Sequence, residues 1–212
     1  MATVRVSDLI DQTRIILQDK DAIRWSDAEF LGWTASAYRE IVRNRPDSNS
    51  TYAPLTTVAD SHQALPNDGA YLISVVRNES GKKRAIRPIE RHILDSQNPD
   101  WHTVNATTSS DYAKYYVYEK DSPKDFYLYP APPAGVLIGI QYARIPTAHL
   151  STTEFISLDD TYAGLIVDYM LYRAYSKDAS VGDASLAQHY MQIFYQQLGV
   201  AIASNTRATT TA

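Results

Sequence analysis

The spacing of apolar residues changes twice along the chain, and this change constrains the fold more than any other sequence feature. In about the first 45 residues, and again after residue 150, apolar side chains recur at the three- and four-residue intervals of a helix. Between these segments, prolines become frequent and apolar residues alternate with polar ones, as they do in strands. The pattern predicts an α+β protein in which a β-rich segment is inserted between two helical ones.

The N-terminal segment carries a clear helix-start signal. Ser26 is followed three residues later by Glu29, the spacing of a capping box in which each side chain bonds the other residue's backbone amide. The helix that begins there should end before Pro46, because the residue before a proline avoids the helical region. An earlier helix opens at Ser7, so we expect residues 1–46 to form a helical hairpin.

The middle segment, residues 47–150, predicts an antiparallel β-rich domain. Residues 75–77 and 84–87 flank a loop that contains Gly81, and we expect them to form a hairpin. Residues 115–118 and 126–129 flank a second turn, and the alternation that follows, over residues 136–143, predicts a further strand. A short helical turn is expected around residues 89–95.

Residues 151–203 return to helical spacing and predict a second helical hairpin, with Asp159 or Asp160 capping its first helix. The two hairpins bury their apolar stripes best against each other, which predicts a four-helix bundle from which the β-rich domain projects. Residues 204–212 are small and polar, and we expect them to form a flexible C-terminal tail.

Composition excludes several function classes. The chain of 212 residues has 20 Lys and Arg against 24 Asp and Glu, a formal net charge of −4, and so lacks the cation excess of tight nucleic-acid binders. It has no cysteine, which excludes disulfides, thiolate metal sites and cysteine nucleophiles. Because no apolar stretch is long enough to span a membrane, we expect a soluble protein with no membrane partner, made in the cytoplasm.

No compact motif for catalysis or metal binding is present. No pair among the five histidines has the spacing that places two imidazoles on one helix face. His92 and His102 could meet across a loop near Asp95 or Asp100, but we interpret them as surface or hydrogen-bonded histidines. The chain has neither the Gly-x-Ser-x-Gly nucleophile elbow nor a phosphate-binding P-loop. We therefore expect no enzymatic activity, no catalytic residue, no metal and no cofactor.

Two regions are candidates for contact with another protein. Lys82, Lys83 and Arg84 follow Gly81, and they form either a solvated turn or a charged docking point for an acidic partner. Tyrosines occupy both faces of the second predicted hairpin, where they suit either a core or an interface. The candidate contact residues of this aromatic region and of the tail are Trp101, Tyr115, Tyr127, Tyr129, Asn205, Thr206 and Arg207.

Several short segments, taken in their order along the chain, carry a resemblance to a known family. They are Arg-Trp-Ser-Asp-Ala-Glu at 24–29, Arg-Pro at 45–46, Leu-Pro at 65–66, Val-Val-Arg-Asn at 75–78, Ile-Glu-Arg at 89–91, Asn-Pro-Asp-Trp at 98–101, Phe-Tyr-Leu-Tyr-Pro-Ala-Pro-Pro at 126–133, Tyr-Ala-Arg-Ile-Pro at 142–146, Ile-Ser-Leu-Asp-Asp-Thr-Tyr at 156–162 and Leu-Tyr-Arg-Ala-Tyr-Ser-Lys-Asp at 171–178. Together they resemble the head-to-tail adaptors of short-tailed bacteriophages, the group similar to tail tubular protein A. Residues 34–37, Thr-Ala-Ser-Ala, depart from the family, in which a more polar Asn-Asp pair is expected after the tryptophan.

The resemblance implies a helical bundle with a β-rich extension, no catalysis, and a dodecameric ring between the portal protein and the tail nozzle protein. DNA would pass through the ring, which would be assembled in the host cytoplasm and sit at the head–tail interface of the virion. Twelve copies would carry a charge of about −48, and we hypothesise that a net negative lumen repels phosphates so that DNA slides. We also hypothesise that residues 204–212 order against the portal, as a flexible segment can on binding.

Two other function classes remain open. The aromatic β region, including Trp101, could stack on sugar rings and act as a carbohydrate-binding module. Alternatively, the protein could be a hydrolase in which His92 or His102 meets a carboxylate and a serine only in the folded chain, because such triads are defined by geometry.

Overall fold

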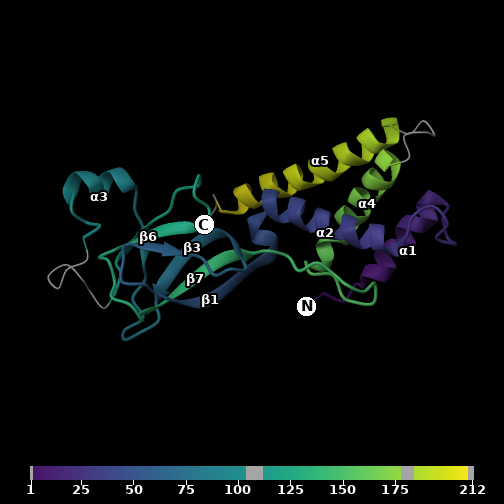
Figure 1. Ribbon diagram of the computed structural model, residues 1–212. Coiled ribbons are helices and arrows are strands. Elements are labelled where there is room, and N and C mark those ends of the chain that lie inside the picture. The colour runs from purple at the N-terminus through teal and green to yellow at the C-terminus, as the bar shows by residue number, and fades with distance from the viewer. Residues whose placement is uncertain (1, 104–111, 178–183, 210–212) are drawn as a thin grey trace. The chain divides into compact units, whose positions relative to one another are not determined.

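The chain divides into two compact units in a computed structural model that describes residues 2–103, 112–177 and 184–209 (Figure 1). Unit 1 comprises Met1–Asn49 and Pro146–Ala212 and is helical, whereas unit 2 comprises Ser50–Ile145 and holds the strands. The protein is therefore a mixed α+β structure, as the change in apolar spacing predicts.

Unit 1 contains the helices α1 (Val6–Leu17), α2 (Asp27–Asn44), α4 (Ala163–Lys177) and α5 (Ala184–Thr209), with short 3-10 turns at Pro46–Asn49 and Asp160–Tyr162. Helix α4 packs against each of the other three (Figure 1). The largest fully buried side chains of this unit are Phe30, Tyr38, Ile41, Ile166, Met170, Leu171 and Phe194.

Local signals explain where these helices begin and end. The capping box of α2 is confirmed, because Ser26 Oγ accepts a hydrogen bond from Glu29 N at 3.4 Å and Glu29 Oε2 accepts one from Ser26 N at 3.1 Å. The helix ends at Asn44, before Pro46, as predicted. Helix α1 begins at Val6, slightly before Ser7, because the Asp8 carboxylate bonds the preceding Arg5 amide.

The two aspartates that precede α4 have different partners. Asp159 caps the 3-10 turn that leads into the helix, accepting a hydrogen bond from Thr161 N at 3.0 Å. Asp160 instead accepts hydrogen bonds from the backbone of Thr3 at 3.0 Å and of Val4 at 3.2 Å. Asp160 thus fastens the N-terminal segment to the start of the second helical hairpin.

Helix α5 continues to Thr209, beyond residue 203, where the sequence places the start of the tail. The backbone of residues 204–209 is therefore helical, and no proline or glycine between residues 200 and 209 interrupts it. The last three residues of the expected tail, 210–212, lie outside the described residues. None of the described helices is long and apolar enough to cross a bilayer.

Unit 2 holds two sheets. The first has the order β1 (Ser50–Thr56), β7 (Leu137–Arg144), β3 (Gly69–Asn78), and the second has the order β2 (His62–Ala64), β6 (Asp125–Tyr129), β5 (Tyr115–Val117), β4 (Arg87–Pro88). The helix α3 (Arg91–Gln97) follows β4, close to the helical turn that the sequence predicts. The core between the strands is formed by Leu72, Val75, Ile86, Ala113, Tyr116, Phe126, Leu128, Ile138, Ile140 and Tyr142.

One predicted hairpin forms, and the other is truncated. Strands β5 and β6 pair antiparallel, with Tyr116 opposite Leu128, which confirms the second hairpin. In the first predicted hairpin, Arg77 of β3 forms an antiparallel bridge with Ala85. The chain does not continue along β3 after this bridge, because β4 instead pairs with β5, in parallel. The β-rich domain is therefore mainly antiparallel, as expected, with the β4–β5 pair as an exception. Pro88, which has no amide to donate, is accommodated because β4 lies at the edge of its sheet.

Candidate interaction surfaces

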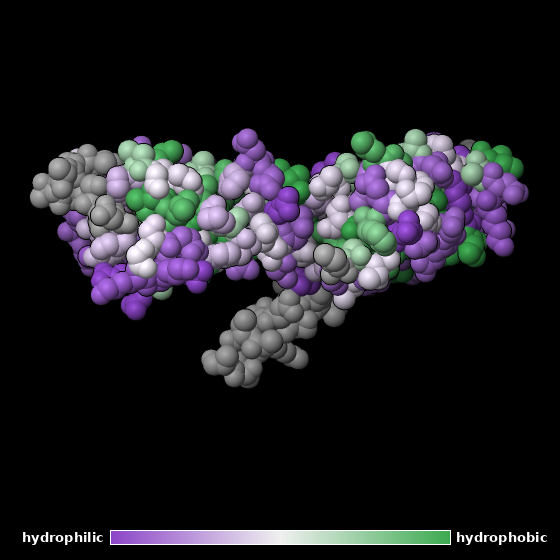
Figure 2. Space-filling view, turned by 90° about the horizontal axis from the view of Figure 1, so that it is seen from below, coloured by the Kyte–Doolittle hydropathy of each residue, from purple (hydrophilic) through white to green (hydrophobic). Residues whose placement is uncertain are grey.

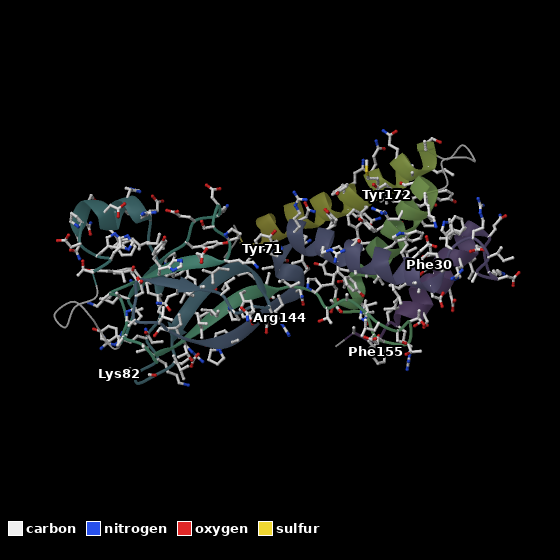
Figure 3. All side chains as sticks on the ribbon, in the orientation of Figure 1. Phe30, Tyr71, Lys82, Arg144, Phe155 and Tyr172 are labelled. Atoms are coloured by element: carbon white, nitrogen blue, oxygen red, sulfur yellow. The ribbon has the colours of Figure 1, made fainter. Side chains whose placement is uncertain are left out.

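The basic turn after β3 lies at the surface of unit 2. Lys82, Lys83 and Arg84 are all exposed there, and the turn depends on a left-handed backbone at Gly81 (φ 62°) and Lys83 (φ 49°). Figure 3 shows Lys82 at the outer edge of this turn. Lys83 Nζ lies 4.0 Å from the carboxylate of Glu79, so its charge is partly balanced.

Two further cations adjoin this turn, one shortly after it in the sequence and one much further along the chain. Arg87 of β4 and Lys114 before β5 are exposed, and the Arg87 amide donates to the Lys114 carbonyl at 3.0 Å. The Arg84 guanidinium lies 4.7 Å from the centroid of the Tyr112 ring, and Lys114 Nζ lies 5.9 Å from it. We call Lys82, Arg84, Arg87 and Lys114, around Tyr112, the basic patch. The sequence did not reveal that Lys114 belongs to this patch, because the fold brings it beside Arg87.

The aromatic region is organised around Trp101, which is only 2% exposed. Its ring stacks on His102 at 3.7 Å between centroids and meets Tyr127 edge-on at 5.9 Å, while its Nε1 donates to Asp95 at 2.8 Å. Leu94 and Val117 complete the cluster. The buried, stacked ring of Trp101 thus holds α3 against the sheet, and its contact with a partner stays a prediction.

The three candidate tyrosines are half-buried. Tyr115 lies opposite Tyr129 across the β5–β6 ladder, and Tyr129 Oη accepts a hydrogen bond from Asn98 at 2.9 Å. Tyr127 packs beside Trp101 and lies 5.8 Å below the Arg91 guanidinium. Each ring therefore contributes mainly to the fold and presents only part of its surface.

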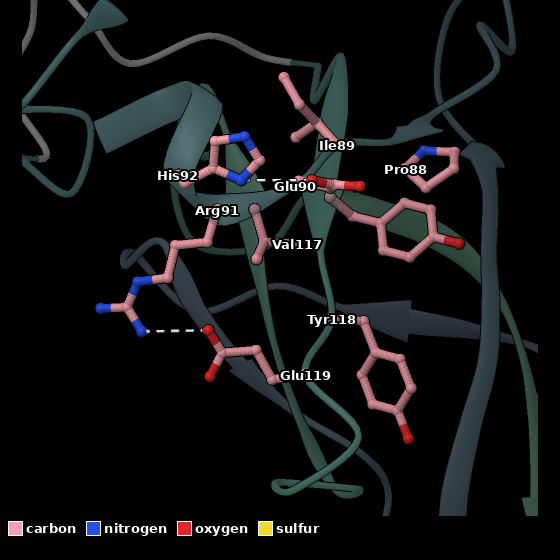
Figure 4. Close-up of a pocket in the computed structure, with 9 residues that line it drawn as sticks. Pro88, Ile89, Glu90, Arg91, His92, Val117, Tyr118 and Glu119 are labelled. Atoms are coloured by element: carbon pink, nitrogen blue, oxygen red, sulfur yellow. Dashed lines mark hydrogen bonds and ion pairs between the residues drawn. The ribbon is translucent and has the colours of Figure 1, made fainter. Parts of the chain in front are cut away.

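A groove of about 560 Å³ lies between the start of α3 and β5 (Figure 4). The charged side chains that line the groove pair with each other: Arg91 lies 3.3 Å from Glu119, and His92 lies 3.2 Å from Glu90. The hydrogen bond that Arg91 donates to the Glu119 carboxylate raises the pKa of Arg91, and burial raises the pKa of the Tyr118 phenol. The groove holds no serine or cysteine beside a base, so it offers no arrangement for nucleophilic catalysis.

Unit 1 contains a cluster that the sequence did not reveal. His149, which is 8% exposed, places Nδ1 at 3.1 Å from Glu154 and Nε2 at 3.2 Å from Ser157 Oγ, the order of a catalytic triad. However, Tyr38 Oη also lies 3.0 Å from Nε2, and Ser157 Oγ donates to the Thr147 carbonyl at 2.9 Å. The serine hydroxyl is thus already engaged, and the cluster fastens residues 147–157 onto α2.

Neither histidine singled out from the sequence completes a catalytic or metal site. His92 pairs with Glu90. His102 Nδ1 shares a hydrogen bond of 2.9 Å with Ser61 Oγ. Asp60 contacts that serine rather than the second nitrogen of the histidine, so it does not orient the imidazole as a triad requires. Among the described residues, no group of three or more histidines and acids is placed to hold a metal ion.

The remaining candidate residues are in α5. Asn205, Thr206 and Arg207 belong to the helical backbone that ends at Thr209, and their side chains lie outside the described part of the chain. Their role in partner binding stays a prediction.

A comparison with known protein families identifies the chain as a whole. No curated protein sequence matches it. Residues 4–212, which include both units, match the family described as SU10 adaptor protein. The match covers nearly the full length, and it agrees with the resemblance carried by the segments between residues 24 and 178. The chain therefore belongs to the SU10 adaptor protein family, a family of bacteriophage head-to-tail adaptors.

Proposed function

We propose that this phage structural protein forms a dodecameric ring between the portal protein and the tail nozzle protein, and that DNA passes through the ring. The observation that carries the proposal is the family match over both units. An adaptor must offer separate surfaces to two neighbours, and a helical unit with a distinct β-rich unit supplies them in one chain.

In this proposal, the helices of unit 1 form a four-helix bundle that is the structural part of the ring. The contacts of α4 with α1, α2 and α5 support this arrangement, because they bury the apolar faces of the two helical hairpins together. The C-terminal segment, residues 204–212, would then dock on the portal. Its deletion should abolish attachment to the head, and normal attachment would contradict this role.

The charge of the ring suits a conduit. A chain with a net charge of −4 gives a ring that repels phosphates, so DNA would slide without binding tightly. Changing lumen-facing acids to lysine, once a ring structure shows which they are, should slow DNA ejection at low salt. Ejection at the wild-type rate would argue against a repulsive lumen.

We propose no catalytic step, metal or cofactor for this protein. The carbohydrate-binding alternative lacks its main aromatic platform, because Trp101 is buried and stacked. For the hydrolase alternative, the residues that the structure describes place no available nucleophile at His92, His102 or His149.

The direct test is assembly on a purified portal, because a subunit of this kind can stay monomeric until a template is present. Purified protein mixed with portal should give a complex with twelve copies of the chain by native mass spectrometry, and this complex should then bind the nozzle protein. A chain that remains unbound beside an intact portal would contradict the proposal.

A further inference from the structure

We propose that the basic patch of unit 2 is a docking site for an acidic polypeptide segment, one rich in Asp and Glu. The inference rests on the proposed function only in that this segment would belong to a neighbouring virion protein. The argument depends on the charges of the patch, on how they are held and on the shape of the surface between them.

The cations of the patch lack acidic partners. Among the residues that the structure describes, Lys82, Arg84, Arg87 and Lys114 form no ion pair with Asp or Glu. Elsewhere in unit 2, exposed arginines are paired, as Arg91 is with Glu119 and Arg144 with Asp68. Four like charges gathered without an acid create a positive potential that an anionic partner would relieve.

The patch is fixed in place by a buried side chain. Asn78, which is 1% exposed, donates through Nδ2 to the carbonyls of Arg84 at 3.0 Å and Ala113 at 2.8 Å. Its Oδ1 accepts a hydrogen bond from the Ala113 amide at 2.9 Å. One amide therefore joins the turn that carries Arg84 to the segment that carries Lys114. Because the cations are already positioned, a partner would lose little additional entropy in ordering them.

The surface between the cations is hollowed on both sides of Arg84. One hollow, of about 310 Å³, is lined by Asn78, Ser80, Gly81, Lys82, Arg84 and Tyr112. The other, of about 230 Å³, is lined by Arg84, Ala85, Arg87, Tyr112, Ala113, Lys114 and Tyr115. Hollows of this size accommodate single side chains, and a carboxylate in either would meet at least one cation. Arginine and tyrosine are also enriched where two proteins bury surface.

These features favour a polypeptide over nucleic acid. Unit 2 has as many acids as bases, and Glu79 lies beside the patch, so a long polyanion would meet repulsion around it. The patch also presents single charges in side-chain-sized hollows rather than a basic strip that follows a phosphate backbone.

The test is direct binding of a fluorescein-labelled peptide of alternating glutamate and glycine, followed by fluorescence anisotropy with the full chain. Replacing both Arg84→Glu and Lys114→Glu should weaken binding about tenfold or more, because two charge-assisted contacts become repulsive. The control carries Lys120→Glu and Lys124→Glu, which make the same change in net charge at exposed positions outside the patch. The control should bind within about threefold of wild type. Circular dichroism should show that both variants are folded.

Three results would overturn the proposal: equal loss of peptide binding in both variants, patch-dependent binding of a labelled DNA duplex in place of the peptide, or patch-dependent self-association of the chain.

Recovery of each tagged variant from phage-producing cells separates this inference from the proposed function. If wild type recovers portal and nozzle and the Arg84/Lys114 variant loses neither, the patch inference fails while the adaptor role stands. If wild type recovers neither protein but binds the peptide through the patch, the adaptor role fails instead.

Discussion

Charged side chains have opposite surroundings in two regions of the molecule. At the turn between α1 and α2, Arg14 and Asp19 are paired and buried, whereas the cations of the basic patch of unit 2 are exposed. In the turn, the Asp19 carboxylate is 4% exposed, lies 3.3 Å from Arg14, and accepts hydrogen bonds from the amides of Ile23, Arg24 and Trp25. In the patch, Arg84 and Lys114 lie over one tyrosine ring, and neither forms an ion pair with an acid in the described part of the chain. Charges with partners inside the fold stabilise it, whereas charges left without partners are available to another molecule.

The largest effect should come from Trp101, which belongs with the residues that stabilise the fold. Trp101→Ala removes a buried ring and leaves a cavity, and should lower the free energy of unfolding by about 4 kcal/mol. Urea unfolding followed by far-ultraviolet circular dichroism measures the change. His102→Ala, which removes only the exposed partner of the stack, should cost about 1 kcal/mol or less. If Trp101→Ala left stability unchanged and reduced partner binding, the ring would belong to an interface instead.

The turn at Asp19 should come next. Asp19→Ala leaves Arg14 with its second acid, Asp27, at 2.7 Å, but it removes the acceptor for the amides of Ile23, Arg24 and Trp25. We expect a loss of about 3 kcal/mol in the free energy of unfolding. Asp21→Ala, at an exposed position in the same turn, should change it by about 0.5 kcal/mol or less. A similar effect at both positions would show that the buried network is not what holds the turn.

The pH dependence of this turn follows from the same contacts. Burial opposes ionisation of Asp19, but hydrogen bonds from the amides of Arg24, Trp25 and Ile23, with the charge of Arg14, outweigh it and lower the pKa. A lowered pKa in the folded state contributes stability above the unfolded pKa of about 3.9, and this stability is lost as the pH falls below that value. The acid-induced loss of stability below about pH 4 should therefore be smaller in Asp19→Asn than in wild type.

A smaller effect is expected at Tyr38. Tyr38→Phe removes a fully buried hydroxyl that contacts His149 and accepts a hydrogen bond from Ser157 N at 3.2 Å, and should cost about 1–2 kcal/mol. Tyr195→Phe removes an exposed hydroxyl that donates to Glu40 and should cost about 0.5 kcal/mol or less. Thermal unfolding at neutral pH compares the two variants, and equal shifts would contradict a structural role for the His149 cluster.

Alkaline pH gives a second measurement on Tyr38. Burial raises the pKa of Tyr38 to about 12, above its usual value of about 10. The contribution of the protonated Tyr38 hydroxyl to the free energy of unfolding is fully present below about pH 10. It is lost between about pH 10 and pH 12, because the tyrosine of the unfolded chain releases its proton at a lower pH than that of the folded chain. Wild type should therefore lose about 2–3 kcal/mol more than Tyr38→Phe across this range. Parallel curves for the two proteins would contradict the prediction.

The smallest effect on stability should come from the basic patch. Replacing both Arg84→Gln and Lys114→Gln should change the free energy of unfolding by about 0.5 kcal/mol or less, since both side chains are exposed and form no ion pair with a described residue. Any change should be a gain that diminishes as salt is added, because the substitutions relieve repulsion. A loss of more than about 1 kcal/mol would mean that the cations serve the fold, and the contrast with Asp19 would disappear.

The parts of the fold that depend on neighbours in sequence could be predicted. The capping box at Ser26 and Glu29, the helix end before Pro46 and the β5–β6 hairpin each follow from residues a few positions apart. The parallel pairing of β4 with β5 could not be predicted in this way. It joins Arg87 to Tyr115 across an intervening helix and loop, and neither strand is long enough to show a periodic pattern.

The same limit applies to the candidate surfaces. Lys82, Lys83 and Arg84 could be found because they are consecutive, whereas Lys114, far along the chain, joins the patch only through the fold. The local contacts of Trp101 could not be predicted, because an aromatic residue in a polar loop has the same sequence signature in a partner contact and in a small local core. Contacts such as its hydrogen bond to Asp95 become visible only in the structure.

The most direct test of the adaptor role is quantitative mass spectrometry of the proteins recovered with a tagged copy of this chain from phage-producing cells. The account predicts portal and nozzle proteins, with the chain and the portal in near-equal copy number. Recovery of neither protein, with a sugar or metabolite bound to the chain instead, would contradict the account.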